Sequence, residues 1–359
     1  MSVPAILGIE ARAVVAPLQR GIRTASGAIE AAPLLLLDVR TDQGITGSAY
    51  LFAYSPLVLR SLRSLVEQVT PLLRGQPVVP VARQEQLARQ FRLLGLQGLL
   101  GMVVATLDMA FWDVLGKAAG QPVVRLLGGD ERRTRAYDSW GLVDPAVDGP
   151  MLERSVARGF RGIKIKLGGA DLAHDVATVQ EVRAIVGDDV ALMVDYNQSL
   201  DPMEAIRRIG ALERFALEWV EEPVAAEDLQ GHARVRARSR IPIQTGENWW
   251  FPRDAERALA AQACDRMMPD LMKIGGITGW QSVMGLAHAA SMPMSSHIFI
   301  EASAHVLAVT PTCDWLEYMD FASSVLREPA VLEQGGVAPR GPGLGIAWDE
   351  AAVARHLVP

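Results

Sequence analysis

A series of ionisable side chains recurs along the second half of the chain, at intervals of about one β-strand plus one helix. A lone aspartate after a strand is usually a turn former or a helix cap, and a lone histidine there is more often structural than catalytic. Independent caps would not favour the same end of consecutive strands. We therefore interpret the series as one site, formed by Lys164, Lys166, Asp195, Glu221, Glu247, Asp270, His297 and Glu317.

Three carboxylates of this series have the character of a metal site. Asp195, Glu221 and Glu247 follow successive β-rich runs, and no Cys or His lies among them. Hard oxygen ligands that leave room for water and substrate suit Mg²⁺ rather than Zn²⁺. The sequence therefore predicts a Mg²⁺ cofactor, for which Mn²⁺ is an acceptable substitute.

The lysines and the histidine are candidates for acid–base chemistry. Lys164 and Lys166 occupy alternate positions of one strand, so they point to the same face. Each lowers the pKa of the other, and a nearby cation adds to this, so one lysine can act as a base near neutral pH. Asp270 is expected beside His297, where it would fix the imidazole tautomer. In a barrel the two bases would approach a substrate from opposite sides.

A barrel is the element arrangement that brings such residues together. Helix-length segments separate most of the β-rich runs, which predicts a (β/α)₈ barrel with its site at the carboxyl ends of the strands. Lys273 closes the sixth run and is expected to be a supporting cation, whereas Glu222 and Glu227 are interpreted as loop or surface charges. The runs span residues 134–140, 160–167, 190–197, 217–223, 241–248, 265–274, 292–299 and 314–320.

The first part of the chain has a different pattern. Two apolar runs flank Asp42-Gln43-Gly44, which predicts a hairpin, and helical periodicity follows over 56–73 and from Val81 to about Gly116. We expect an α+β domain at 1–130, the barrel at 131–320, and a turn-rich segment at 321–359 that packs back on the first domain.

Composition excludes several classes of protein. The chain has 359 residues, a formal net charge of −6 and two cysteines, so neither a nucleic-acid partner nor a disulfide framework is expected. The apolar stretch 94–116 contains Gln97, Asp108 and Asp113, which predicts a buried helix rather than a membrane span. The N-terminus lacks the pattern of a signal peptide, and we expect a soluble, cytoplasmic protein.

The residues of the site resemble those of the mandelate racemase subgroup of the enolase superfamily. The likeness includes the Lys-x-Lys pair, the three carboxylates, the Asp–His pair and Glu317, and the sequences VDYNQSLD, GENW and PMSSH. This resemblance implies an α/β fold, a (β/α)₇β modified TIM barrel with an N-terminal α+β capping domain. It also implies a homo-oligomer that acts on a small 2-hydroxy carboxylate.

The resemblance further implies a role for each residue. Lys166 would remove the α-proton of one enantiomer and His297 that of the other. Lys164 and Mg²⁺ would neutralise the substrate carboxylate, and Glu317, held protonated, would donate a hydrogen bond to it. Polar contacts to the substrate would come from Ser139 and Asn197.

The substrate side chain is expected to meet an apolar lid. The family pattern has a histidine at Trp140, valines at Ile22 and Ile29, and a leucine at Ile298, so the pocket here is bulkier. Expected lid residues are Ile22, Ile29, Phe52, Tyr54, Leu93 and Ile298.

Three functions are compatible with this pattern. An apolar lid favours racemisation of mandelate or a similar 2-hydroxy acid. Dehydration of an acid sugar shares the first half-reaction and would need a polar lid, for which Arg23 and Arg92 are the nearby candidates, although both are expected on the surface. A non-catalytic barrel that binds metal or carboxylate is disfavoured, because binding alone needs neither base.

Overall fold

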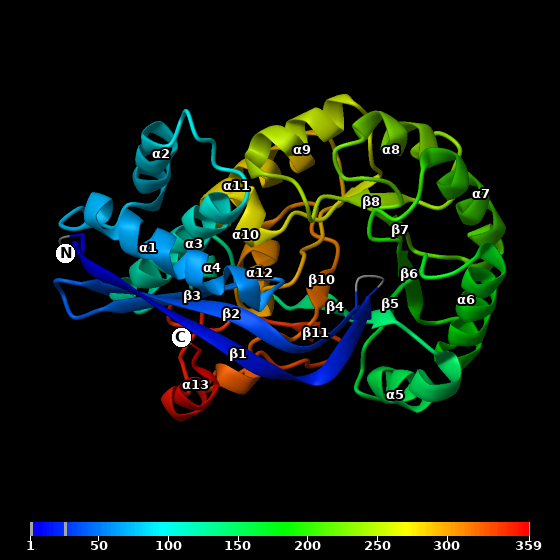
Figure 1. The fold of residues 1–359 in the computed structure, drawn as a ribbon, viewed down its shortest axis with the longest axis horizontal. Coiled ribbons are helices and arrows are strands. Elements are labelled where there is room, and N and C mark those ends of the chain that lie inside the picture. Colours follow the sequence, from blue (N-terminus) through cyan, green and yellow to red (C-terminus); the bar gives the residue numbers. More distant parts are fainter. Residues whose placement is uncertain (1–2, 25–26, 359) are drawn as a thin grey trace.

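The chain folds into an α+β unit that lies against a barrel of parallel strands. A computed structural model describes residues 3–24 and 27–358 (Figure 1). We call the first unit the cap; it contains the strands β1 (Ile6–Thr24), β2 (Gly27–Thr41) and β3 (Thr46–Phe52) and the helices α1 (Leu59–Leu73), α2 (Pro80–Gln90), α3 (Leu99–Ala119) and α4 (Val123–Leu126).

The cap sheet is antiparallel, and its first hairpin is unusually long. β1 pairs with β2, and β2 pairs with β3 through a turn at Asp42-Gln43-Gly44, as the sequence predicts. The β1–β2 register shifts between Pro17 and Ile22, after which Ile22 faces Ile29. Both strands run from the cap toward β4 and β5 of the barrel (Figure 1).

The apolar stretch of the sequence forms the helix that joins cap and barrel. α3 is long and apolar enough to cross a membrane by length and composition, but 83% of its most apolar window is buried. It packs against β3 of the cap and α11 (Gly276–Ala289) of the barrel. The expected continuous helicity from Val81 to Gly116 is wrong, because the chain breaks between α2 and α3, where Gly95 and Gly98 adopt positive φ angles of 85° and 69°.

The barrel strands are parallel, and each pairs with its neighbour along the chain. β10 pairs with β4, and isolated bridges from Met294 to Met267 and Cys313 connect the two ends of this strand order, β9 and β10. The strands are β4 (Thr134–Leu142), β5 (Gly162–Lys166), β6 (Ala191–Asp195), β7 (Val220–Glu221), β8 (Ile243–Thr245), β9 (Arg266–Met267) and β10 (Leu316–Tyr318).

Two expected strands differ from the sequence-based prediction. The sixth run, 265–274, contains only the short β9; Asp270 then caps the helix α10 (Leu271–Ile274), so Lys273 lies on a helix. The seventh run makes isolated parallel bridges, at Met294 and His297, instead of a regular strand. Asp270 and Gly275 bound α10, which explains why the apolar run does not continue as a strand.

Helices surround the barrel, and four of them begin after an aspartate whose carboxylate accepts hydrogen bonds from their free N–H groups. Asp201, for example, accepts hydrogen bonds from the backbones of Met203 and Glu204, both at 2.9 Å, and a proline follows it at the first helical position. The remaining helices are α5 (Pro145–Ala157), α6 (Leu172–Val186), α7 (Pro202–Leu212), α8 (Leu229–Arg236), α9 (Phe251–Ala260) and α12 (Ile300–Val309).

The C-terminal segment contacts both units. β11 (Gly336–Val337) pairs with β4, whereas α13 (Glu350–His356) lies against β1. The Trp348 indole donates to the Asp38 carboxylate of β2 at 2.8 Å, and Val14 of β1 bridges Leu357.

Close contact between β3 and α3 requires a glycine at position 47. A Cβ added there would lie 2.3 Å from the Ala110 carbonyl oxygen and 2.5 Å from a Val114 methyl group. Gly47→Ala should therefore lower the free energy of unfolding by about 1–3 kcal/mol in urea titration. Gly210→Ala is the matched control, because its Cβ would meet nothing within 4 Å on exposed helix α7. Gly210→Ala should raise the free energy of unfolding by up to about 1 kcal/mol. Equal changes in the free energy of unfolding for the two variants would contradict the close contact at Gly47.

Candidate active site

The strand-end residues surround one cavity of about 520 Å³ between the barrel and the cap hairpin. Asp195, Glu221 and Asp270 are buried behind its wall, and Ser139 lines a smaller neighbouring cavity. Eleven further residues that the sequence singles out line it: Ile22, Ile29, Phe52, Tyr54, Lys164, Lys166, Asn197, Glu247, His297, Ile298 and Glu317.

The carboxylates fit a Mg²⁺ ion. Asp195, Glu221 and Glu247 are buried and offer oxygen atoms that lie within 4.8 Å of one another. Burial, opposed by Lys164 and reinforced by the other carboxylates, raises the pKa of Glu221 to about 7. A divalent cation relieves this crowding of negative charge, and an all-oxygen donor set is the kind that Mg²⁺ prefers. These three side chains are placed to hold such an ion.

Each lysine of β5 is paired with one of these carboxylates. The Lys164 amine lies 2.5 Å from Glu221 and 2.8 Å from Glu317, and the Lys166 amine lies 2.6 Å from Asp195. Burial acts to lower the pKa of Lys166, but Asp195 outweighs it, so that pKa lies above its ordinary value. Lys164 does lower the pKa of Lys166, but by less than Asp195 raises it. The sequence-based expectation of a pKa near neutrality includes the charge of a bound divalent cation and stays a prediction.

His297 and Asp270 form the pair that the sequence predicts. The histidine Nδ1 lies 2.5 Å from the Asp270 carboxylate, and its Nε2 faces the cavity at 3.3 Å from Glu247. Burial disfavours the imidazolium, yet Glu247 and Asp270 outweigh it and raise the pKa of His297 to about 9. Asp270 therefore leaves Nε2 as the nitrogen that can exchange a proton with a ligand.

The ionisation state of Glu317 depends on its nearest charges. Burial favours the neutral acid, but Lys164 and His297 lower the pKa of Glu317 to about 2. The Ile298 backbone also donates to its carboxylate at 3.0 Å. Glu317 is therefore ionised in this arrangement, because Lys164 and His297 together outweigh burial. The expected protonated form belongs to the site with substrate bound and stays a prediction.

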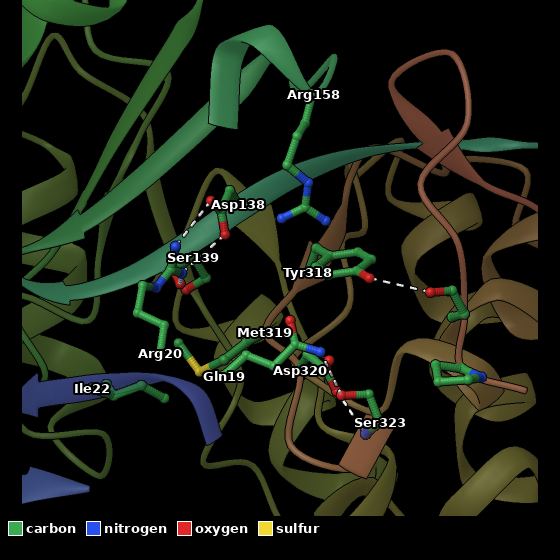
Figure 2. A pocket seen from close by; sticks show the side chains of 12 residues that line it. Gln19, Arg20, Ile22, Asp138, Ser139, Arg158, Tyr318, Met319, Asp320 and Ser323 are labelled. Carbon is green, nitrogen blue, oxygen red and sulfur yellow. Dashed lines mark hydrogen bonds and ion pairs between the residues drawn. The ribbon is translucent and has the colours of Figure 1, made fainter. Parts of the chain in front are cut away.

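Two polar residues were predicted to contact the substrate. The Asn197 side chain lines the cavity and donates to Asp195 at 3.0 Å. Ser139 is fully buried, and its hydroxyl lies close enough to Glu317 to lower that pKa, yet it makes no hydrogen bond of regular geometry within 3–24 and 27–358. Figure 2 shows Ser139 next to Asp138, at the smaller cavity of about 210 Å³.

The wall opposite the charged residues is apolar. Ile22, Phe52 and Ile298 are buried, and the Phe52 ring lies between those of Tyr54 and Phe321 at centroid distances of 4.8 and 4.1 Å. Met319, which directly follows β10, and Phe321 of the C-terminal segment also line the cavity. Neither was predicted, because no pattern in the sequence indicates where this part of the chain packs.

Three sequence-based expectations about the lid can be compared directly. Leu93 is wrong as a lid residue of this chain, because its side chain is 101% exposed on the loop between α2 and α3. Arg23 pairs with Asp148 and Arg92 is exposed, so both lie outside the cavity, as expected. The cavity lid therefore has no arginine.

The interpretation of Glu222 as a loop or surface charge is wrong. Glu222 is fully buried and receives a hydrogen bond from Asn248 at 2.7 Å, and Asn248 in turn accepts one from Lys273 at 2.7 Å. Lys273 is thus a supporting cation, as expected, whereas Glu227 is exposed. The two consecutive glutamates at the end of the fourth β-rich run were the available signal for a buried Glu222. β7 ends at Glu221, and the backbone of Glu222 adopts a φ of 33°, which turns its side chain inward.

Comparison with known proteins agrees with this geometry. Residues 8–128 match the mandelate racemase / muconate lactonizing enzyme N-terminal domain, and residues 150–352 match the family described as enolase C-terminal domain-like. A crystal structure of an enolase from Bradyrhizobium complexed with magnesium and mandelic acid is 56% identical, covers 100% of both chains and superposes with a TM-score of 0.98.

Characterised relatives have several activities. The chain is similar to the L-talarate/galactarate dehydratase of Salmonella typhimurium, with 33% identity over 264 residues, or 72% of this chain and 66% of that protein. It is also similar to the 3,6-anhydro-α-L-galactonate cycloisomerase of Streptomyces coelicolor, with 32% identity over 92% of this chain and 93% of that protein. With both domains matched over most of its length, the chain belongs to the enolase superfamily.

Proposed function

We propose that this Mg²⁺-dependent, α-proton-abstracting enzyme of the enolase superfamily racemises mandelate or a similar apolar 2-hydroxy acid. The observation that carries the proposal is the cavity itself. Two potential bases, Lys166 and His297, line it below a wall of apolar side chains. The similarity to an enolase complexed with magnesium and mandelic acid supports the same substrate class.

The proposed chemistry moves one proton between two faces of the substrate. The Lys166 amine, in its neutral form, takes the α-proton of one enantiomer, and the C–H electron pair moves into the carboxylate. The His297 imidazolium then donates its Nε2 proton to the opposite face of the α-carbon. In the reverse direction neutral His297 removes the proton and the Lys166 ammonium returns one. Asp270 holds Nδ1, so the same nitrogen, Nε2, acts in both directions.

The second negative charge that develops on the carboxylate needs strong compensation. Lys164 supplies a fixed positive charge, and Ser139 supplies a buried hydroxyl that has no regular hydrogen bond to a described residue. Glu317 takes up a proton as the anionic substrate arrives, because two carboxylates in one site disfavour a second ionisation. A bound Mg²⁺, held by Asp195, Glu221 and Glu247, would add charge neutralisation and weaken the hold of Asp195 on Lys166.

Acid-sugar dehydration is the second candidate, and the similarity to a talarate/galactarate dehydratase favours it. The same first proton abstraction would then be followed by loss of a 3-hydroxyl, protonated by His297. Against it stands the lid, since Ile22, Ile29 and Phe52 offer no partner for sugar hydroxyls. A buried hydroxyl without a hydrogen bond costs roughly 1–3 kcal/mol, and several would be buried at once.

Metal dependence follows from the carboxylate cluster. Chelation should abolish activity, and Mg²⁺ or Mn²⁺ should restore it. Glu221→Gln removes one anionic ligand, so calorimetry should show Mg²⁺ affinity reduced by about 100-fold or more. Glu227→Gln is the matched control on the exposed part of the same loop and should bind Mg²⁺ normally. Full activity of a rigorously metal-free sample would refute the cofactor assignment.

The two bases should be separable by isotope exchange. In ²H₂O, His297→Asn should stop racemisation but still exchange the α-proton of the enantiomer that faces Lys166. Lys166→Met should retain exchange of the other enantiomer only, as followed by ¹H NMR. His288→Asn, on the exposed face of α11, should behave as the native enzyme. A variant of either base that exchanges both enantiomers equally would rule out the two-base mechanism.

Substrate class can be tested with a panel of 2-hydroxy acids, hexonates and hexarates. Racemisation is read by polarimetry, and dehydration by release of the keto product. We expect turnover of mandelate and poor or no reaction of acid sugars. Ile29→Ala should lower kcat/KM for mandelate by about 10-fold through lost apolar contact and improve larger aryl substrates. Val147→Ala, at an exposed position of α5, is the control and should leave kcat/KM for mandelate unchanged. Efficient dehydration of a hexarate with mandelate inert would overturn the proposal.

A further inference from the structure

An arginine of the cap strand is bound to the barrel strand that carries Ser139. The Arg20 guanidinium donates to both oxygens of Asp138, at 3.1 and 3.0 Å, and to the Ser139 carbonyl oxygen at 2.7 Å. Figure 2 shows this side chain reaching from the cap strand to Asp138 and Ser139, with Ile22 nearby on the same strand. One side chain therefore joins the two units of the protein beside the predicted site.

The partners of Arg20 form a closed network. The guanidinium lies over the Trp140 ring, 3.6 Å from its centroid, and the Trp140 indole donates to Asp138 at 2.9 Å. The Ser155 hydroxyl adds a third donor to the same carboxylate, at 2.5 Å. The Asp138 side chain is only 6% exposed, so its charge depends on these donors. A flat guanidinium suits both the bidentate ion pair and the stacking, which a lysine cannot reproduce.

The local backbone is arranged so that this contact can form. Arg20 lies where β1 is out of register with β2, between Pro17 and Ile22, so this part of the strand is free to turn toward β4. β1 and β4 also approach closely at Gly141 of β4, where a Cβ would lie 2.1 Å from the Arg23 carbonyl oxygen of β1. The cap hairpin thus rests directly on the barrel strand.

The residues on either side of the network belong to the predicted site. Ile22, two positions beyond Arg20, lines the large cavity from the cap, and it also lines the smaller cavity that contains Arg20. Ser139, next to Asp138, has a buried hydroxyl without a regular hydrogen bond to a described residue. A shift of Arg20 would therefore move a lid residue and a substrate donor together.

We propose that Arg20 is a positioning residue, which holds the cap hairpin closed over the cavity and keeps Ser139 oriented toward the substrate carboxylate. This inference rests on the proposed function for its kinetic part, whereas the closure of the hairpin does not depend on it. Ser139 would contact the carboxylate both before and during proton transfer, so its displacement weakens binding more than it slows chemistry.

The first test uses Arg20→Met, which keeps length and apolar contact but loses charge and donors. KM for mandelate should rise about 10-fold or more, as expected for loss of charge-assisted hydrogen bonds, with kcat reduced by less than about 3-fold. Hydrogen exchange of backbone amides in residues 17–29 should accelerate by about 10-fold or more without any ligand. Arg40→Met, at an exposed position of β2 in the same hairpin, is the control; both readouts should stay near native values.

Two further variants keep the test valid if Arg20→Met folds poorly. Arg20→Met combined with Asp138→Asn removes the buried charge together with its partner, and it should show the same rise in KM and in exchange. Arg20→Lys should have a KM and a hairpin exchange rate between those of the native enzyme and Arg20→Met, since lysine keeps the charge but not the bidentate geometry. A lower melting temperature with unchanged KM and unchanged hairpin exchange would reduce Arg20 to a structural residue and overturn the proposal.

The exchange experiment separates this inference from the proposed function. Faster exchange in Arg20→Met, in a protein that acts on acid sugars instead of mandelate, would support hairpin closure while refuting the substrate class. Native exchange and native KM in an active mandelate racemase would refute the role of Arg20 alone.

Discussion

Charge compensation at the carboxyl end of the barrel is the constraint on which the rest of the site depends. Asp195, Glu221 and Glu247 are buried within reach of one another, and buried charges of one sign are costly unless cations neutralise them. The parallel register places a cation beside these carboxylates, because Lys166 of β5 faces Asp195 of β6. Asp195 in turn faces Glu221 of β7. A slip of one residue in any of these strands would turn the side chain to the helices outside the barrel and leave a charge unpaired.

The cap covers this charged floor with apolar side chains, which reduce the room for water beside it. Its hairpin, β3 and the C-terminal segment bring apolar side chains over the cavity from parts of the chain far apart in sequence. Ion pairs and hydrogen bonds to a substrate are stronger in such a water-poor space. The close contact of Gly141 with Arg23 sets the cap hairpin against the barrel, so the position of the lid follows from the packing of two units rather than from the hairpin alone.

Errors in the sequence-based predictions share a physical origin. The run 265–274 was expected to be a strand, yet its second half is a helix, because Asp270 and Gly275 bound it and short apolar runs fit either element. Glu222 was expected at the surface but is buried, since adjacent residues at a strand end can both turn inward when the backbone adopts a positive φ. The ionised form of Glu317 in this arrangement could not be expected from the sequence, because a pKa depends on the nearest charges, here Lys164 and His297.

The residue types and their spacing by themselves determined the barrel, the order of the strand-end residues and the three carboxylates that lie together at its rim. These follow from local rules, since a repeated strand and helix put each strand end on the same rim. Only the tertiary structure decided which cap side chains cover the cavity, that Leu93 does not, and that Arg20 contacts Asp138 and Ser139. Contacts between units separated by more than a hundred residues depend on how whole surfaces pack, and no local pattern in the chain encodes them.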